Sequence, residues 1–212
     1  MANLTKARAK PRKIPKQDRS REMVATILEA TARVLVKEGY ARATTNRVAA
    51  AAGISVGSLY HYFPGKDALV VALMHRHRAQ MLATVGAHLS GLTAGPLETT
   101  VPALIRAVLD AHGINPKLHR VLLERVLNSD ARAEVSGFEP RLEKMVHDAL
   151  ASHKDSLRVK SVEMASFILV QLIVSVARTA VVDRPRILKD GAADPRLVDE
   201  LSDVVLRYLL GT

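Results

Sequence analysis

Apolar residues recur every three or four positions along most of this chain, which is the spacing of amphipathic helices. The first such stripe predicts a helix over residues 18–38 and consists of Met23, Ile27, Ala30, Val34 and Leu35. Further stripes predict helices at about 46–51, 56–62, 66–90, 97–112, 117–128, 131–152, 160–182 and 195–210. No stretch alternates between apolar and polar residues with a period of two and turn residues at its ends, so nothing argues for a sheet. The pattern predicts an all-α fold of about nine helices.

Short segments between residues 39 and 66 carry the clearest helix boundaries. Gly39 closes the first helix, Thr44 or Thr45 caps the second, and Ser55 caps the third. Gly53 lies in the turn between the second and third helices, where a left-handed backbone is easiest for glycine. The small Ala49 permits two helices to approach closely, while Val48, Ile54 and Leu59 are spaced to face inward. This arrangement predicts a helix-turn-helix unit over about residues 43–62.

Charge is concentrated at the N-terminal end of the chain. The net charge is +10, of which residues 1–21 contribute +7, residues 22–66 contribute +2 and residues 67–212 contribute +1. We therefore expect three parts: a disordered basic tail over 1–17, a DNA-binding domain over 18–66 and a larger helical domain over 67–212. The tail is either a solubilising extension or an arm that contacts phosphates or the minor groove.

The third short helix presents small or hydrogen-bonding residues on its outer face and no acidic residue, as a helix that meets a polyanion requires. Three segments carry a resemblance: GYARATT from Gly39, VAAAAGIS from Val48 and GSLYHYFPGKDAL from Gly57. Together they resemble the TetR family of repressors over about residues 19–70. The resemblance implies a homodimer that binds double-stranded operator DNA through the helix-turn-helix, and a helical ligand-binding domain whose small-molecule inducer relieves repression.

The resemblance also implies roles for individual residues. Val56, Gly57 and Ser58 begin the recognition helix, and Thr45 and Asn46 begin the helix before it. The remaining DNA contacts implied are Tyr60, His61, Tyr62, Lys66 and, as an extra phosphate contact, Arg47. The recognition face lacks Arg, Asn and Gln, the residues best suited to bidentate base readout, so DNA shape is expected to contribute to specificity.

The larger domain has to dimerise and to bind the inducer. Two strongly apolar helices, 160–182 and 195–210, are the expected dimer interface, with contacts from Phe167, Leu169, Leu172, Val176, Leu197, Leu201, Val204, Val205 and Tyr208. The alternative is that both helices only complete the core of one protomer. Candidate pocket residues are Met74, Met81, His112, Phe138, Met145, Phe167 and Arg178, although Met and Phe at helical spacing also fit a plain core.

Other classes of function lack their signatures in this sequence. There is no cysteine, no HExxH or GxSxG motif and no phosphate-binding glycine loop, so we expect neither an enzyme nor a cofactor. His75 and His77, two apart on a helix, point in different directions and cannot share a metal, as is also true of His147 and His153. The apolar run 162–182 contains Gln171 and Arg178 and is better explained by burial between a core and a second subunit than by a membrane.

We expect a cytoplasmic protein associated with the nucleoid through DNA. Two alternatives stay open: a DNA-binding regulator with no small-molecule inducer, and a structural protein that binds DNA or a membrane surface through its basic tail.

Overall fold

The computed structural model describes residues 16–90, 95–113, 115–127, 137–182, 188–189 and 192–211. These residues form α1 (Lys16–Arg42), α2 (Thr45–Ala52), α3 (Val56–Tyr62), α4 (Lys66–Ser90), α5 (Leu97–Gly113), α6 (Pro116–Leu127), α8 (Phe138–Ala151), α9 (Val162–Val182) and α10 (Pro195–Leu210). A 3₁₀ turn, η1 (Lys154–Ser156), follows α8. The all-α prediction is confirmed. The basic tail up to residue 15 and the expected helical segment 131–136 lie outside the described residues.

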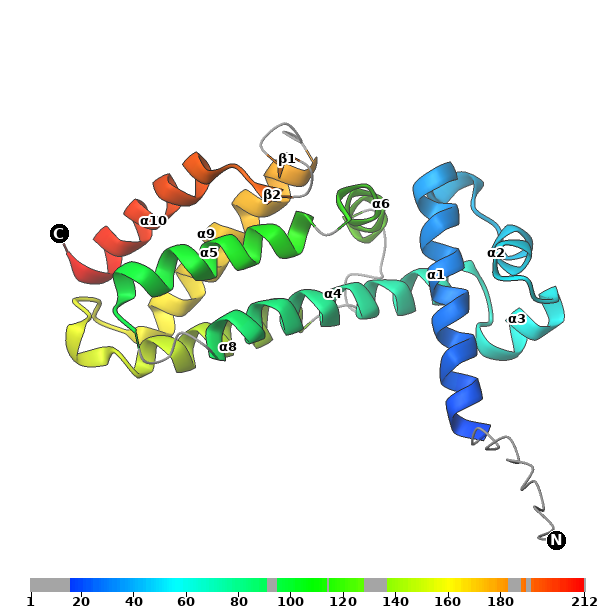
Figure 1. The fold of residues 1–212 in the computed structure, drawn as a ribbon, viewed down its shortest axis with the longest axis horizontal. Helices are drawn as coiled ribbons and strands as arrows, with labels where there is room; N and C mark the ends of the chain where they lie inside the picture. The colour runs from blue at the N-terminus through cyan, green and yellow to red at the C-terminus, as the bar shows by residue number, and fades with distance from the viewer. Residues whose placement is uncertain are drawn as a thin grey trace, which may run out of the picture.

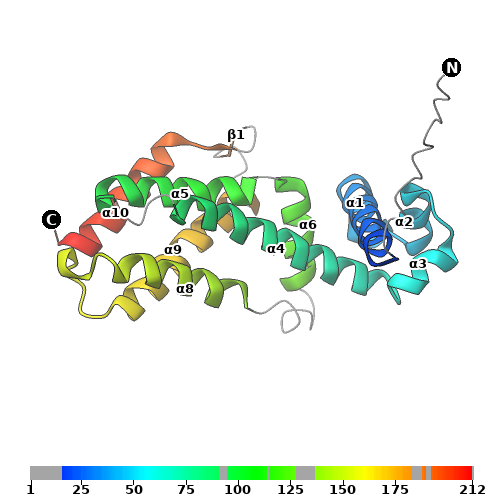
Figure 2. The ribbon, with the colours of Figure 1, turned by 60° about the horizontal axis from the view of Figure 1, so that its bottom comes forward.

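The elements are arranged in two groups joined by one long helix. We call α1, α2 and α3 the head, and α5, α8, α9 and α10 the body. Figures 1 and 2 show α4 running from the head into the body, with α6 standing between α1 and the body. α6 contacts α1 on one side and α5 and α9 on the other. The head is therefore attached to the body by α4 and α6 together.

Each group has its own hydrophobic core. The head core is built around the buried Ile27, Leu35 and Leu59, and it continues into α4 as far as Met74. Leu118 and Leu122 of α6 also belong to it. The boundary expected at residue 66 therefore falls inside this core. The body core is formed by α4 from Met81 onward with α5, α8, α9 and α10.

Two local features differ from the expected pattern. Gly39 has a φ of +74° and interrupts α1 as expected, but a further helical stretch follows it up to Arg42. β1 (Leu188–Lys189) pairs with β2 (Ala192–Ala193) as a two-stranded antiparallel ladder in a segment for which we expected only a loop. Ala193 is buried in the body core, and its N–H donates to Asp110 Oδ1 at 3.0 Å, so this ladder closes over α5. Four residues are too few to carry a periodic signal in the sequence.

Candidate nucleic-acid interface

α2 and α3 form a helix-turn-helix whose boundaries follow from their capping residues. The Thr44 hydroxyl accepts from the Arg47 N–H at 3.3 Å, and the Ser55 hydroxyl accepts from the Ser58 N–H at 3.0 Å. Gly53 ends α2 in the left-handed conformation, at φ +69° and ψ +30°. Each side-chain cap satisfies a backbone donor that the first turn of a helix leaves without a partner. The sequence rules for caps thus account for both ends of α2 and for the start of α3.

Inward-facing residues fix the angle between the two helices. Val48, Ala49 and Leu59 are at most 2% exposed, and Ile54 packs against the same core. The Arg33 guanidinium of α1 donates to the Ala51 carbonyl at 2.9 Å, tying α1 to the end of α2. These contacts hold α3 as a rigid projection on the outer side of the head.

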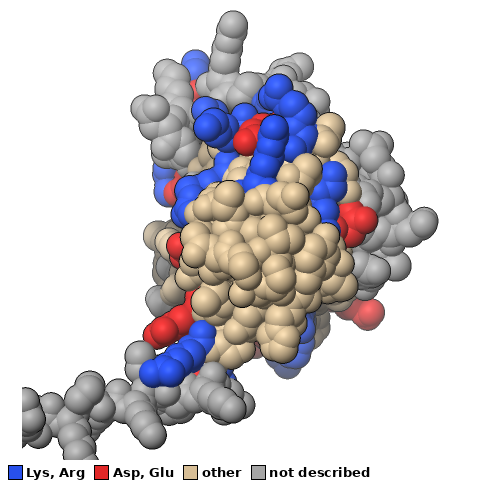
Figure 3. Space-filling view, turned by 90° about the vertical axis from the view of Figure 1, so that its right-hand side faces the viewer, with Lys and Arg blue, Asp and Glu red and all other residues tan. Residues whose placement is uncertain are grey.

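The outer face of α3 carries the residues that the sequence assigned to DNA recognition. Val56 is 36% exposed and Tyr60 is 50% exposed. Gly57, Ser58 and His61 are also exposed, while Tyr62 is partly buried against the head core. Figure 3 views the head end of the molecule and shows an uncharged surface at its centre, with Lys and Arg around much of its rim. Such a surface is suited to groove contacts at its centre and phosphate contacts at its edge.

Tyr60 is held in place by the preceding helix. Its hydroxyl lies 3.2 Å from the Thr45 Oγ1, so α2 and α3 are joined across their exposed side. Asn46 is exposed next to Thr45 at the start of α2. The structure therefore brings Thr45 and Tyr60 together on the exposed side of the head.

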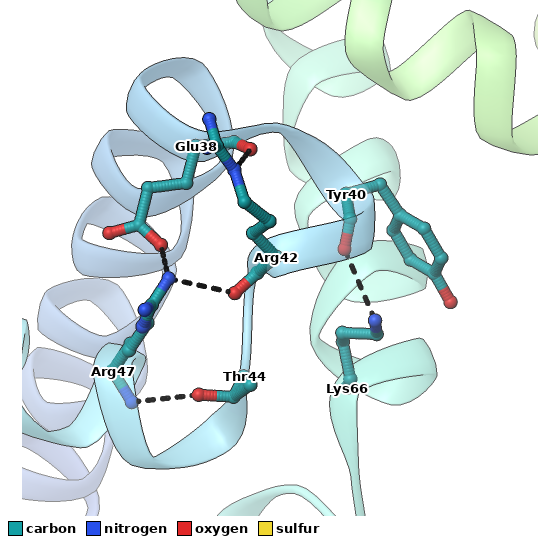
Figure 4. A network of polar contacts seen from close by, with 6 residues as sticks. All are labelled: Glu38, Tyr40, Arg42, Thr44, Arg47 and Lys66. Atoms are coloured by element: carbon teal, nitrogen blue, oxygen red, sulfur yellow. Dashed lines mark hydrogen bonds and ion pairs between the residues drawn. The ribbon is translucent and has the colours of Figure 1, made fainter.

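The side chains of two residues predicted to contact phosphates, Arg47 and Lys66, bond to residues of α1 in this structure. Arg47 Nη1 forms an ion pair with Glu38 and donates to the Arg42 carbonyl at 3.1 Å (Figure 4). The Lys66 ammonium donates to the Tyr40 carbonyl at 3.1 Å and lies 4.0 Å from the centroid of the Tyr40 ring. Both cations link α1 to a neighbouring helix. The sequence pattern identified them as basic residues near the motif but did not reveal Glu38 and Tyr40 as their partners.

Comparisons with known proteins agree with this geometry. The family described as bacterial regulatory proteins, tetR family, matches residues 27–73, and the tetracyclin repressor-like C-terminal domain matches residues 96–209. The chain belongs to the TetR family. The helix-turn-helix described above lies within the residues that match the family's N-terminal model.

The names of individual relatives of this TetR-family chain describe different functions. The nucleoid occlusion factor SlmA of Haemophilus ducreyi is 32% identical over 135 residues, which cover 62% of this chain and 65% of that protein. A TetR-family regulator from Mesorhizobium loti has the same fold, with a TM-score of 0.74 at 18% identity, covering 90% of this chain and 98% of the other. The fatty acid degradation regulator FadR from Bacillus halodurans superposes with a TM-score of 0.69 at 17% identity, covering 92% and 97%. The structural matches establish the fold alone.

A cavity lies in the body, at the end of α4 farthest from the head. Its volume is about 40 Å³, and it is partly open to solvent. The lining comes from α4, α5, α8, α9 and α10 and includes Leu89, Val101, Ala149, Ile173 and Leu209. The polar side chains at its wall are engaged with backbone carbonyls: Thr100 Oγ1 donates to Pro96 O at 3.0 Å, and His153 Nε2 lies 2.8 Å from Gly95 O. The cavity therefore offers an apolar wall.

The pocket residues expected from the sequence do not gather around this cavity. Met81, Phe138 and Met145 pack in or against the body core, and Met74 lies in the head core. His112 is buried at the end of α5, whereas Phe167 and Arg178 are exposed on α9. The actual lining consists of Leu, Val, Ile and Ala residues that resemble any core in sequence, so no sequence signal distinguishes it.

The second surface of interest is an exposed apolar strip on α9 and α10, which consists of Met164, Phe167, Ile168, Val204 and Tyr208. The sequence pattern identified Phe167, Val204 and Tyr208 but missed Met164 and Ile168.

The other expected interface residues lie deeper in the protomer. Leu169, Leu201 and Val205 are at most 7% exposed and belong to its own core, so their part in an interface stays a prediction. The remaining three, Leu172, Val176 and Leu197, are partly buried against that core.

The apolar character of α9 is explained by its two faces, one in the body core and the other in the exposed strip. Residues Val162–Ala180 are long and apolar enough to cross a membrane by length and composition, the one such helix among the described residues. Core helices of globular proteins pass the same test, and α9 has Ala165, Val170 and Ile173 in the body core and Phe167 and Ile168 in the exposed strip.

Proposed function

We propose that this chain is a homodimeric repressor that binds operator DNA in the cytoplasm, at the nucleoid, and is released by an apolar small molecule held in the body. The observation that carries this proposal is the course of α4. This helix has 25 residues, so it is about 37 Å long. Lys66 at its start is bound to Tyr40 of the head, and Leu89 near its end lines the cavity. A ligand that displaces Leu89 thus acts on the same rigid element that supports the helix-turn-helix.

The exposed strip on α9 and α10 supports dimerisation. Five large apolar residues on two adjacent helices are more than the single apolar residues scattered over ordinary protein surfaces. Pairing the same strip on two copies gives a closed two-fold assembly, which places two recognition helices for half-sites about 34 Å apart. In this arrangement α9 and α10 of both copies form a four-helix contact.

Sedimentation equilibrium tests the dimer. Replacing Phe167 with Glu puts a charge in the strip, and we expect this variant to be monomeric and to bind a two-half-site operator at least about tenfold more weakly. Ala79→Glu adds the same charge at an exposed position of α4, away from α9 and α10, and is expected to stay dimeric. A wild-type chain that sediments as a monomer, or a Phe167→Glu variant that stays dimeric, contradicts the proposed interface.

The wall of the cavity supports a ligand without charged groups. Burying a hydrocarbon chain in such a cavity leaves no hydrogen bond unmade, whereas burying a polar group without a partner costs roughly 1–3 kcal/mol. Calorimetry with a graded series of short alkanols tests this: we expect binding that tightens with each added methylene until the cavity is full.

A cavity-filling variant localises that binding. Ala149 lines the cavity, so Ala149→Leu is expected to abolish calorimetric binding while operator affinity persists. Ala83→Leu, at an exposed position of α4, is the matched control and is expected to bind alkanols like the wild type. Alkanol binding that is equally strong in Ala149→Leu places the ligand elsewhere.

The relationship to SlmA favours a second candidate: a DNA-binding protein that acts across the chromosome without an inducer. A genome-wide footprint of the purified chain separates the two functions. A repressor is expected at a few promoters, and a chromosome-wide factor at many sites irrespective of promoters.

The third possibility, binding through the basic tail, predicts that deleting residues 1–17 abolishes DNA binding, whereas the helix-turn-helix proposal predicts only a weakened affinity.

A further inference from the structure

Three buried histidines lie where the two cores meet. The buried stripe of α4 runs through Met74 of the head core to Met81 of the body core, and His77 lies between them, 3% exposed. His112 ends the buried stripe of α5 and is 2% exposed. His119 of α6, 7% exposed, follows Leu118 of the head core. We call these three residues the histidine seam.

The seam bonds α4 to α6 directly. His77 Nε2 and His119 Nδ1 are 2.8 Å apart, so one ring donates and the other accepts. His112 Nδ1 lies 2.8 Å from the Val108 carbonyl, which only accepts, so this nitrogen carries the hydrogen. The ring centroids of His112 and His119 are 5.1 Å apart in an edge-to-face arrangement. The described residues contain no group of three or more His, Asp or Glu side chains placed to hold a metal ion.

The surroundings of the seam disfavour its protonation. Burial lowers the pKa of His77 and of His112 to about 4, and that of His119 to about 2. The neighbouring rings add to this effect, His112 on His77 and both His112 and His77 on His119. Two cations add to it further: Arg78 of α4 acts on His77 and His119, and Arg178 of α9 acts on His112. Glu139 of α8 acts on Arg78. Among the described residues, α1, α5 and α6 supply no carboxylate that shifts these rings, so a proton taken up here has no counter-charge.

Acid opens this contact by stabilising the opened form: rings released from burial regain the ordinary histidine pKa of about 6.5 and are protonated at pH 5.5, whereas the buried rings are not. With two protons, His77 Nε2 and His119 Nδ1 both carry hydrogens and face each other as donors, so the hydrogen bond cannot form. α6 then keeps its leucines in the head core but loses its hydrogen bond to α4. The attachment of the head to the body through α6 is thereby weakened, and α4 carries more of it.

We propose that the histidine seam is an acid-released latch between the head and the body, so that operator affinity falls on acidification while both cores remain folded. Its consequence for DNA binding rests on the dimer proposed above, because two heads match two half-sites only while each is held at a fixed angle to its body. The opposite trend is expected without a latch. Acid adds positive charge to exposed histidines, which strengthens binding to a polyanion.

The test is the pH dependence of operator binding by the full-length chain. A DNA duplex recovered by selection from random sequence serves as the probe, and fluorescence anisotropy gives its Kd at pH 7.5 and pH 5.5 at constant ionic strength. We expect the wild type to lose about tenfold or more in affinity. The double variant His77→Gln/His119→Asn places amide nitrogens and oxygens near the two bonded positions and does not titrate. It is expected to lose less than about twofold.

Controls separate the latch from other effects of acid. His75→Gln changes an exposed histidine of the same helix and is expected to follow the wild-type pH profile. Far-UV circular dichroism and sedimentation at both pH values are expected to show a folded dimer. A wild-type Kd that does not rise in acid, or a dimer that dissociates at pH 5.5, overturns the latch.

If the double variant does not fold, hydrogen exchange of wild-type residues 116–127 provides the second measurement. After correction for the intrinsic pH effect, protection of α6 is expected to fall with pH in parallel with the affinity. Protection that stays constant while the affinity falls also overturns the proposal.

Discussion

Lys66 offers a direct test of whether a basic residue near the motif supports the head or contacts DNA. Its ammonium donates to the Tyr40 carbonyl at 3.1 Å and lies 4.0 Å from the centroid of the Tyr40 ring. A hydrogen bond from a charged donor contributes about 1.5–3 kcal/mol, and a partly exposed cation–π contact about 0.5–1 kcal/mol. Lys66 is only partly buried, so the low end of both ranges applies. Lys66→Met keeps most of the aliphatic stem and removes both contacts, so we expect the free energy of unfolding to fall by about 2 kcal/mol.

Urea unfolding followed by circular dichroism measures this loss, and the salt dependence of operator binding measures the other possibility. Because the ammonium is directed at Tyr40, we expect the slope of log K against log salt to stay nearly unchanged. Lys37→Met removes a charge at an exposed position of α1 and is expected to change stability by less than about 0.5 kcal/mol. An unchanged stability together with a slope reduced by about 0.9 refutes the structural role and makes Lys66 a phosphate contact.

Three further predictions concern the head and the seam. Tyr60→Ala removes a half-exposed ring and its contact with Thr45, so we expect operator affinity to drop about tenfold with little change in unfolding free energy; an unchanged Kd contradicts a role in recognition. Gly53→Ala places a Cβ in open space but at φ +69°, so the cost is backbone strain alone, about 1 kcal/mol by urea unfolding, and a loss above about 3 kcal/mol would contradict that view. The pKa values of His77 and His112, lowered to about 4 by burial, make the folded state bind fewer protons than the unfolded state below pH 6.5. Stability is therefore fully present above pH 6.5 and falls toward pH 4, by about 3 kcal/mol for each histidine, and a flat profile between pH 7 and pH 5 would refute this.

Much of the head could be predicted from local sequence because its determinants are local. Thr44 and Ser55 cap α2 and α3 through hydroxyls three residues from the N–H groups they accept from, and Gly53 turns the chain between them. The inward positions Val48 and Leu59 follow helical spacing. Such interactions span a few residues, so the chain order itself contains the geometry. The same holds for the exposed face of α3, whose composition indicated a surface for DNA.

The partners of charged and apolar side chains depended on the tertiary structure. Arg47 and Glu38 come from different helices, and nothing in their spacing shows that they form an ion pair. His77, His112 and His119 lie on three helices up to 42 residues apart, and each looks in sequence like an isolated histidine on an apolar stripe.

Which face of α9 lies in the core and which is exposed was also decided by the helices that pack against it. Periodicity marks the helix but does not say how much of an almost wholly apolar surface the other helices cover. The sequence by itself therefore determined most of the helices and the helix-turn-helix motif, since both follow from contacts within a few residues. The cavity, the exposed strip and the histidine seam were decided only by the tertiary structure, because each is made by helices that are distant in the chain and adjacent in space.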